Sequence, residues 1–151
     1  MTIDWIYKKF SDLSPFELYQ LLRLRSEVFV VEQNCVFLDM DNIDQQCFHL
    51  LGSAENKLVA YARIVPPGIV YTEPSIGRVV TAPSARKKGL GKLLMEQAIK
   101  LVYELYGNTS IKIGAQYYLK EFYSSFGFYR ISDVYLEDGI EHIYMLKNAA
   151  T

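Results

Sequence analysis

The alternation of hydrophobic and polar positions along the 151-residue chain predicts short strands interleaved with three helices. Apolar residues at spacings of three and four favour helices, and short runs rich in β-branched and aromatic residues favour strands. The strongest helical pattern covers residues 89–106 and is followed by Gly107, a typical helix-ending residue. Helices are predicted at 16–29, 89–106 and 117–126, and strands at 3–10, 47–51, 57–65, 76–81, 111–115, 128–135 and 142–147.

This order of elements predicts the α/β (α+β) class, with helices on both faces of a mixed central sheet of six to seven strands. Short turns between the first strands favour antiparallel pairing, whereas the strand–helix–strand unit 76–115 predicts a parallel crossover. Ser14, Pro15 and Glu17 predict a capped start for the first helix. No linker or repeat interrupts the pattern, so we expect one domain over residues 1–151.

Composition and charge narrow the function classes. With 50% hydrophobic residues the chain is globular rather than disordered, and 16 basic against 17 acidic residues leave no electrostatic footprint for nucleic acid. No apolar run reaches the length of about 20 residues that crosses a membrane, and the N-terminus lacks a signal-peptide pattern. Cys35 and Cys47 form no metal-ligand cluster with either histidine. We therefore expect a cytoplasmic protein with reduced cysteines, no metal, and neither a membrane nor a nucleic acid as partner.

A basic, glycine-containing turn between a strand and the best helix predicts a phosphate site. A helix N-terminus offers unpaired N–H groups and a positive dipole end, and glycine lets an anion approach the backbone closely. The spacing fits neither a P-loop nor a dinucleotide-binding fingerprint, and a solvated loop is the alternative interpretation. The turn and the helix start contain Arg86, Lys87, Lys88, Gly89, Leu90, Gly91 and Lys92.

Two motifs resemble those of the GNAT acyltransferase superfamily. Arg86-x-x-Gly89-x-Gly91, after a strand that ends Val79-Val80-Thr81, is similar to its coenzyme A pyrophosphate loop. The second motif, which has Gln and Leu where the superfamily has Asn and Ala, is Gln116-x-x-Leu119-x-x-Phe122-Tyr123-x-x-Phe126-Gly127-Phe128. Further segments resemble the ElaA-like subgroup, which usually has Pro where Glu141 stands: Leu24–Gln33, Asp41, Asp44, His49, Tyr61–Arg63, Ile76–Val80 and Glu137–His142.

The resemblance implies the GNAT fold and a site for acetyl-CoA. Tyr123 is implied as the general acid that protonates the departing thiolate, although a packing role is the alternative reading of a helix tyrosine. The resemblance also implies that strand 111–116 diverges from strand 76–81, whose backbone N–H groups meet the carbonyl oxygen. The implied coenzyme A-binding residues are Val79, Val80, Thr81, Arg86, Lys87, Lys88, Gly89, Leu90, Gly91, Lys92 and Gln116.

The acceptor side is less defined by the sequence. An amine must lose a proton before it attacks, and the candidates for its base are His142, Glu32, Glu73, Glu137 or a water relay. Three arginines embedded in apolar elements have two interpretations: a clamp for an acceptor carboxylate, or a brace paired with Glu32, Asp41 or Asp44. The arginines are Arg25, Arg63 and Arg78. We take Arg25, Glu32 and Arg78 as candidate substrate-binding residues.

The resemblance implies an N-acetyltransferase that moves an acetyl group from acetyl-CoA to a primary amine by direct attack in a ternary complex. The acceptor is expected to be a small molecule or a peptide, and the protein a monomer or homodimer. One alternative is an acyltransferase like the acyl-homoserine-lactone synthases, which the segment Leu24-Arg25-x-x-Val28-Phe29 also resembles. The other is a coenzyme A-binding sensor without catalysis.

Overall fold

The computed structural model describes residues 2–86 and 88–151, so Lys87, one of the predicted phosphate-binding residues, lies outside the described residues. The described chain forms two sheets with the strand orders β1-β2-β3-β4 and β5-β8-β6, and β7 also pairs with β8. The strands are β1 (Asp4–Lys9), β2 (Phe48–Ala54), β3 (Lys57–Val65), β4 (Ser75–Thr81), β5 (Ile111–Gln116), β6 (Tyr129–Arg130), β7 (Tyr135–Glu137) and β8 (Ile140–Lys147). The helices are α1 (Pro15–Arg25), α2 (Leu90–Tyr106) and α3 (Lys120–Ser124).

Helix α1 begins with the predicted cap. The Glu17 backbone N–H donates to Ser14 Oγ at 3.1 Å, and the Ser14 N–H donates to the Glu17 carboxylate at 2.8 Å. The helix does not continue regularly to residue 29 as predicted, because Ser26–Glu32 forms a π-helix. This wider turn carries the end of the element towards the second sheet, where its last residues meet the functional cleft.

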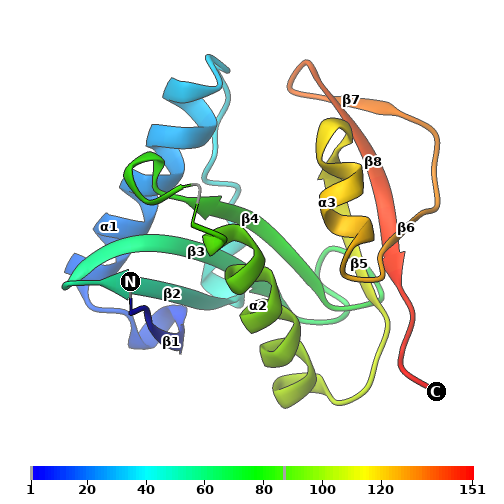
Figure 1. Cartoon of the computed structure of the whole chain (residues 1–151), viewed down its shortest axis with the longest axis horizontal. Helices are drawn as coiled ribbons and strands as arrows, with labels where there is room; N and C mark the ends of the chain where they lie inside the picture. Colours follow the sequence, from blue (N-terminus) through cyan, green and yellow to red (C-terminus); the bar gives the residue numbers. More distant parts are fainter. Residues whose placement is uncertain (1, 87) are drawn as a thin grey trace.

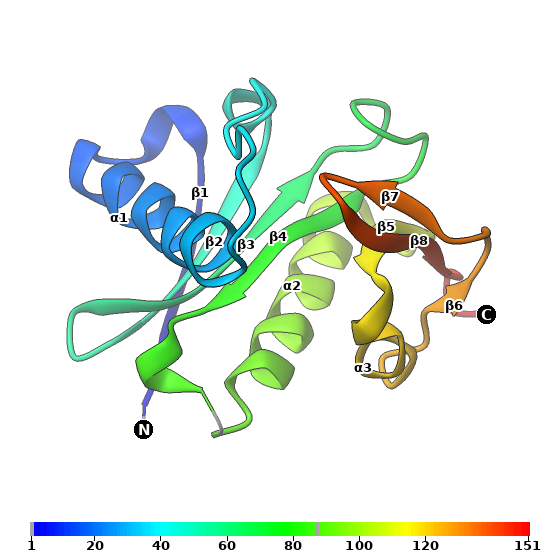
Figure 2. The same cartoon turned by 90° about the horizontal axis from the view of Figure 1, so that it is seen from above.

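The core lies mainly between α2 and the first sheet. The apolar positions of α2 include Leu94, Met95, Ala98 and Val102, all fully buried. Strand β3 is buried over all but its first residue, because α1 covers one face of the first sheet and α2 the other (Figure 2). Helix α3 covers the second sheet, so the predicted helices on both faces are present (Figure 1).

The two sheets touch at one end and then diverge. The Lys112 N–H donates to the Pro74 carbonyl at 3.2 Å, but β4 and β5 form no ladder in the described chain. Figure 1 shows β4 and β5 separating from this contact towards the ends where each strand finishes. The divergence implied by the resemblance is therefore present, and the predicted mixed central sheet is divided at this point into two sheets.

The predicted strand 128–135 is also wrong in detail. It is divided into β6 and β7. Between them the Tyr144 N–H of β8 donates to the side-chain Oγ of Ser132 at 2.9 Å, whereas in a continuous strand it would donate to a backbone carbonyl. The described residues thus contain eight strands, slightly more than the six to seven expected. The division turns β7 towards the cleft.

Candidate active site

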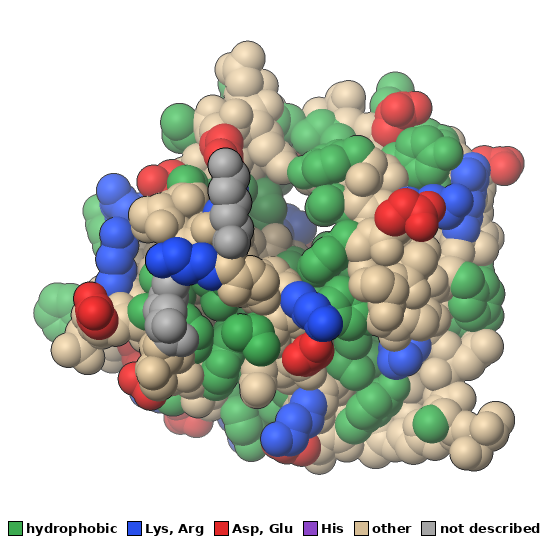
Figure 3. Space-filling view, in the orientation of Figure 1, with side chains coloured by type: hydrophobic (Ala, Val, Ile, Leu, Met, Phe, Trp, Pro, Cys, Tyr) green, Lys and Arg blue, Asp and Glu red, His purple; other side chains and the backbone are tan. Residues whose placement is uncertain are grey.

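A cleft of about 910 Å³ occupies the wedge between β4 and β5. Figure 3 shows a hollow between the half that carries α1 and α2 and the half that carries α3 and β8. The cleft is lined by these sequence-predicted residues: Glu32, Arg78, Val79, Val80, Thr81, Arg86, Gln116, Tyr123 and His142. The first and last of these residues, Glu32 and His142, are 110 positions apart in the sequence and are brought to one surface.

Strand β4 carries a bulge where it borders the cleft. Its register with β3 shifts opposite Tyr61 and Arg63, and Arg78 has a positive φ of 50°. A bulge releases backbone groups from the ladder and re-aims side chains, and a non-glycine residue with positive φ is strained. The edge of β4 that faces β5 has no partner strand in the described chain, so its backbone groups are available to a ligand.

The start of α2 fits an anion. Gly89 precedes the helix with φ of 69°, a left-handed conformation that favours glycine, and no side chain caps the first turn. The backbone N–H groups of Leu90, Gly91 and Lys92 therefore have no intrahelical acceptor. The Leu90 side chain is buried in the core, so only its backbone is available to a phosphate.

Arg86 and Glu32 form an ion pair across the mouth of the cleft. The two guanidinium nitrogens of Arg86 donate to the Glu32 carboxylate at 2.6 and 2.7 Å, and one also donates to the Thr81 carbonyl at 3.4 Å. The hydrogen bond from Arg86 lowers the pKa of Glu32. The Arg86 guanidinium, which the sequence predicts to bind phosphate, thus binds another anion, the carboxylate of Glu32 in the π-helix.

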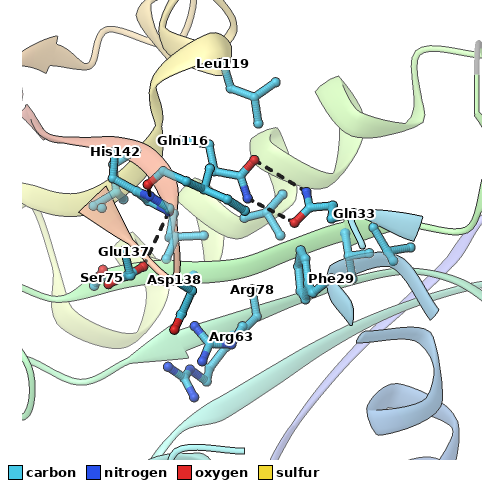
Figure 4. Close-up of a pocket in the computed structure, with 18 of the residues that line it drawn as sticks. Phe29, Gln33, Arg63, Ser75, Arg78, Gln116, Leu119, Glu137, Asp138 and His142 are labelled. Carbon is cyan, nitrogen blue, oxygen red and sulfur yellow. Dashed lines mark hydrogen bonds and ion pairs between the residues drawn. The ribbon is translucent and has the colours of Figure 1, made fainter. Parts of the chain in front are cut away.

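Gln116 meets Gln33 across the same cleft. Their side-chain amides bond reciprocally at 3.4 Å, and Figure 4 shows the pair spanning from the π-helix side to the end of β5. Gln116 stands where the motif usually has Asn, and the longer side chain reaches this partner. Gln33 was not singled out from the sequence as a site residue, although it ends the segment that resembles the ElaA-like subgroup.

Tyr123 lines the cleft from α3, with only 9% of its surface exposed. Its ring packs edge-on against Phe122 and Phe128, with centroids 5.2 and 6.3 Å apart. Burial raises the pKa of the Tyr123 hydroxyl to about 12, so the phenol keeps its proton at neutral pH. The two interpretations of Tyr123 are therefore compatible, because its ring packs while its residue borders the cleft.

The three arginines form a network with three aspartates beneath the cleft. Arg25 is fully buried and donates to Asp39 and Asp44, each at 2.8 Å. Arg63 and Arg78 take part through the remaining contacts, which are Arg63 to Asp41 and Asp44 and Arg78 to Asp39 and Asp41. Arg25 is absent from the cleft lining, so its bonds support the brace rather than the clamp.

The wall opposite this network carries His142 and Glu137. His142 Nδ1 donates to the Ile140 carbonyl at 2.8 Å, and its Nε2 lies 3.4 Å from the Glu137 carboxylate (Figure 4). A carbonyl can only accept, so in neutral His142 the Nε2 atom is a bare acceptor. Tyr135 stacks on the His142 ring with centroids 5.7 Å apart.

Two further tyrosines of the cleft had no sequence signal. The hydroxyls of Tyr135 and Tyr71 lie 3.0 and 3.3 Å from the point where a Cβ on Gly114 would stand, so a larger residue there would displace both hydroxyls. Burial raises the pKa of both, that of Tyr71 to about 12. Tyr71 comes from the connection before β4 and Tyr135 from β7, and only the tertiary fold brings them together.

Three other features of the described residues concern metal ions, membranes and cysteines. No group of three or more His, Cys, Asp or Glu residues suited to a metal ion occurs among them. None of the helices in residues 2–86 and 88–151 is long and apolar enough to span a membrane. Cys35 and Cys47 are both free.

Comparisons with known proteins agree with this geometry. A family model described as an acetyltransferase (GNAT) domain matches residues 26–149. Protein ElaA of Escherichia coli is 40% identical over 147 residues, covering 96% of each chain. A UPF0039 protein of Synechocystis is 44% identical over 147 residues, covering 97% of this chain and 96% of its own.

Solved structures give the same result. An acyl-CoA N-acyltransferase of Pseudomonas aeruginosa superposes with a TM-score of 0.93 at 40% identity, covering 97% of this chain and 99% of that one. Escherichia coli ElaA superposes with a TM-score of 0.91 at 39% identity, covering 97% and 100%. An aminoglycoside 6'-N-acetyltransferase complexed with coenzyme A shares the fold, with a TM-score of 0.71 at 18% identity and coverage of 95% and 96%.

Proposed function

Because the chain belongs to the GNAT acetyltransferase family, we propose that it transfers an acetyl group from acetyl-CoA to a primary amine. The observation that carries the proposal is the wedge between β4 and β5, which is lined by the buried Tyr123 and by Arg86, a residue that lies in sequence just before the uncapped start of α2. A thioester ligand that lies in this wedge meets anion-binding groups at one end and a proton donor at the other.

The start of α2 would hold the pyrophosphate. The N–H groups of Leu90, Gly91 and Lys92 supply hydrogen bonds, and the side chains of Lys88, Lys92 and Arg86 supply positive charge. Lys88 and Lys92 are exposed, so their charges are free to meet an anion. Glu32 would release Arg86 when a phosphate replaces its carboxylate.

The free edge of β4 would orient the acyl group. Backbone N–H groups of Val79 to Thr81 are the expected donors to the carbonyl oxygen as it gains negative charge, and one such donor contributes about 3 kcal/mol in enzymes where it has been removed. Gln116 would hold the pantetheine arm after exchanging its bond to Gln33. Val79 to Thr81 can take their role without leaving β4, and Gln116 can take its role without leaving β5.

Two residues would move protons during direct attack. His142 Nε2 would take the proton of the amine, the amine nitrogen would bond to the acetyl carbon, and the carbon–sulfur bond would break. Tyr123 would then give its proton to the departing sulfur, and its raised pKa keeps that proton available. The presence of both groups on the cleft favours catalysis over a coenzyme A-binding sensor.

The proposal is tested by thermal unfolding with and without acetyl-CoA. We expect acetyl-CoA at millimolar concentration to raise the Tm of the wild type, since a ligand that binds only the folded state stabilises it. Gly91→Trp should abolish this shift, because an indole at the helix start blocks phosphate. Its Cβ would meet only the Phe122 ring, at 3.8 Å, so the variant should fold.

Lys100→Trp is the matched control, because Lys100 is exposed further along the same helix. The Lys100→Trp variant should show the same acetyl-CoA-induced rise in Tm as the wild type. Release of coenzyme A thiol in the presence of an amine mixture then tests transfer itself. An unchanged wild-type Tm, or the absence of thiol release with every amine, would refute the proposal.

A further inference from the structure

The acceptor half of the cleft has an uneven distribution of charge. Its arginines are already neutralised: Arg63 and Arg78 share three aspartates with Arg25, so the network is balanced at three positive and three negative charges. A carboxylate on the acceptor would have to break one of these ion pairs to bind Arg78. The Nε donor of Arg63 has no partner among the described residues, but it is buried away from solvent.

The opposite wall carries negative charge instead. Glu137, at the end of β7, and Asp138, in the turn that follows, line the cleft, and both side chains are exposed. Within the described chain, the one ion-pair partner of Glu137 is His142, which is charged only when protonated. No ion pair of Asp138 occurs in residues 2–86 and 88–151. Glu137 and Asp138 therefore give this wall a net negative charge while His142 is neutral.

The hydrogen-bonding of His142 is a second observation, independent of the charge distribution. The residue is 7% exposed and lines the cleft, and its Nδ1 is committed to the Ile140 carbonyl. While His142 is neutral, Nε2 and the Glu137 carboxylate face each other at 3.4 Å as two acceptors, an arrangement that lacks a donor. An ammonium group has three N–H donors and a positive charge, so it satisfies both acceptors at once.

The surface beside this pair suits an alkyl chain. The Tyr135 ring lies against His142, and the hydroxyls of Tyr135 and Tyr71 both pack close to Gly114. Phe29 lines the same cleft from the π-helix (Figure 4). Aromatic walls pack on methylene groups and attract cations.

We propose that His142 and Glu137 form an ammonium site and that the acceptor is an aliphatic amine with a second positive charge, of the alkyl diamine class, rather than an amino acid. Asp138 attracts the second ammonium group. The inference rests on the proposed acetyl transfer. In that step the bound ammonium group first gives one proton to His142. The nitrogen–carbon bond then forms and the carbon–sulfur bond breaks, the sulfur takes the proton of Tyr123, and the second proton that the nitrogen loses returns to the Tyr123 oxygen.

The test compares three amines of one chain length. Cadaverine, pentylamine and 5-aminopentanoate present the same primary amine with a positive, neutral or negative far end. We expect kcat/KM with acetyl-CoA to fall in that order, with cadaverine about tenfold above 5-aminopentanoate, because a hydrogen bond between charged groups is stronger than one between neutral groups. Binding of each amine to the coenzyme A-loaded protein should follow the same order.

Asp138→Asn should lower kcat/KM for cadaverine about tenfold and narrow its advantage over 5-aminopentanoate, because Asp138 attracts the second ammonium group, whereas Glu137→Gln should lower kcat/KM for all three amines. Glu141→Gln is the matched control, because Glu141 is exposed on the same hairpin and does not line the cleft. It should leave the order and the size of the preference unchanged.

Two failures are distinguishable. If 5-aminopentanoate binds and reacts as well as cadaverine, or Asp138→Asn leaves the preference intact, the inference is overturned while acetyl transfer stands. If no amine is acetylated although the coenzyme A-loaded protein binds cadaverine most tightly, the proposed function fails and the ammonium site stands.

Discussion

At the scale of single residues, burial decides what the polar groups of the cleft can do. Tyr123 is nearly enclosed by aromatic rings, so its phenol stays protonated in the range where a thiolate needs a proton. His142 has one ring nitrogen fixed by a backbone carbonyl, which leaves the other as an acceptor. Surroundings of this kind, rather than residue type, distinguish these groups from the other tyrosines and from His49.

Removing the Tyr123 hydroxyl tests the general acid. We expect Tyr123→Phe to lower kcat by about 10²-fold, because the departing thiolate then leaves without a proton, while the acetyl-CoA-induced Tm shift is kept. Tyr103→Phe is the control, since Tyr103 is half-buried on α2 outside the cleft. Steady-state kinetics with saturating amine measures the effect, and equal kcat values for Tyr123→Phe and wild type would exclude the role.

The residue patterns of the phosphate turn and of the Tyr123 motif could be interpreted from the sequence because each is local. Gly89 and Gly91 lie within one turn, and their backbone requirement follows from the helix that begins beside them. Tyr71, Tyr135 and Asp39 could not be predicted as partners of the site. Each reaches the site from a different loop or strand, and contacts between residues so far apart in the sequence produce no pattern of short spacings.

At the scale of elements, the π-helix Ser26–Glu32 and the bulge in β4 shape the cleft. Gln33 N–H donates to the Val28 carbonyl at 3.0 Å, five residues back, which widens the turn and directs Glu32 and Gln33 over the wedge. The sequence predicts a helix here because its apolar residues continue, and that pattern does not distinguish an α-turn from a π-turn. The bulge at Arg78 likewise produces no periodic pattern of hydrophobic residues by which it could be recognised in the sequence.

The contact between the π-helix and the phosphate turn yields a prediction about affinity. In the absence of phosphate Glu32 forms an ion pair with Arg86, and this pair must break before Arg86 can bind phosphate. Glu32→Gln should therefore tighten acetyl-CoA binding about two- to fivefold, as expected for the loss of a partly exposed ion pair. Isothermal titration calorimetry measures the Kd. Glu104→Gln, an exposed change at the far end of α2, should have no effect. Weaker binding by Glu32→Gln would show that Glu32 supports the ligand instead of competing with it.

At the scale of the whole molecule, two sheets joined at one end create a slot that one continuous sheet would not have. The sequence predicts the order of elements and the class of fold, because hydrophobic periodicity records which faces are buried. It does not record where two neighbouring strands stop pairing. That property depends on the Pro74–Lys112 contact and on the packing of each sheet against its own helices.

The buried tyrosines predict that alkaline pH destabilises the fold. Burial raises the pKa of Tyr71 and Tyr123 to about 12 and raises those of Tyr61 and Tyr135 as well. A raised folded-state pKa gives stability that is complete below the unfolded value near 10 and is lost as pH rises towards 12. The free energy of unfolding in urea should therefore be level up to about pH 9.5 and fall above it.

Tyr123→Phe removes one of these phenols, so its free energy of unfolding should fall less steeply between pH 10 and 11.5 than that of wild type. Identical pH profiles for the two proteins would show that the Tyr123 hydroxyl titrates alike in the folded and unfolded chain.

The central claim is that acetyl-CoA lies in the wedge between β4 and β5, and a crystal structure of the acetyl-CoA complex tests it most directly. We expect the pyrophosphate within hydrogen-bond distance of the N–H groups of Leu90 to Lys92, the pantetheine arm along β4, and the sulfur facing the Tyr123 hydroxyl. A ligand bound outside the wedge, or crystals without acetyl-CoA at millimolar concentration, would contradict the account.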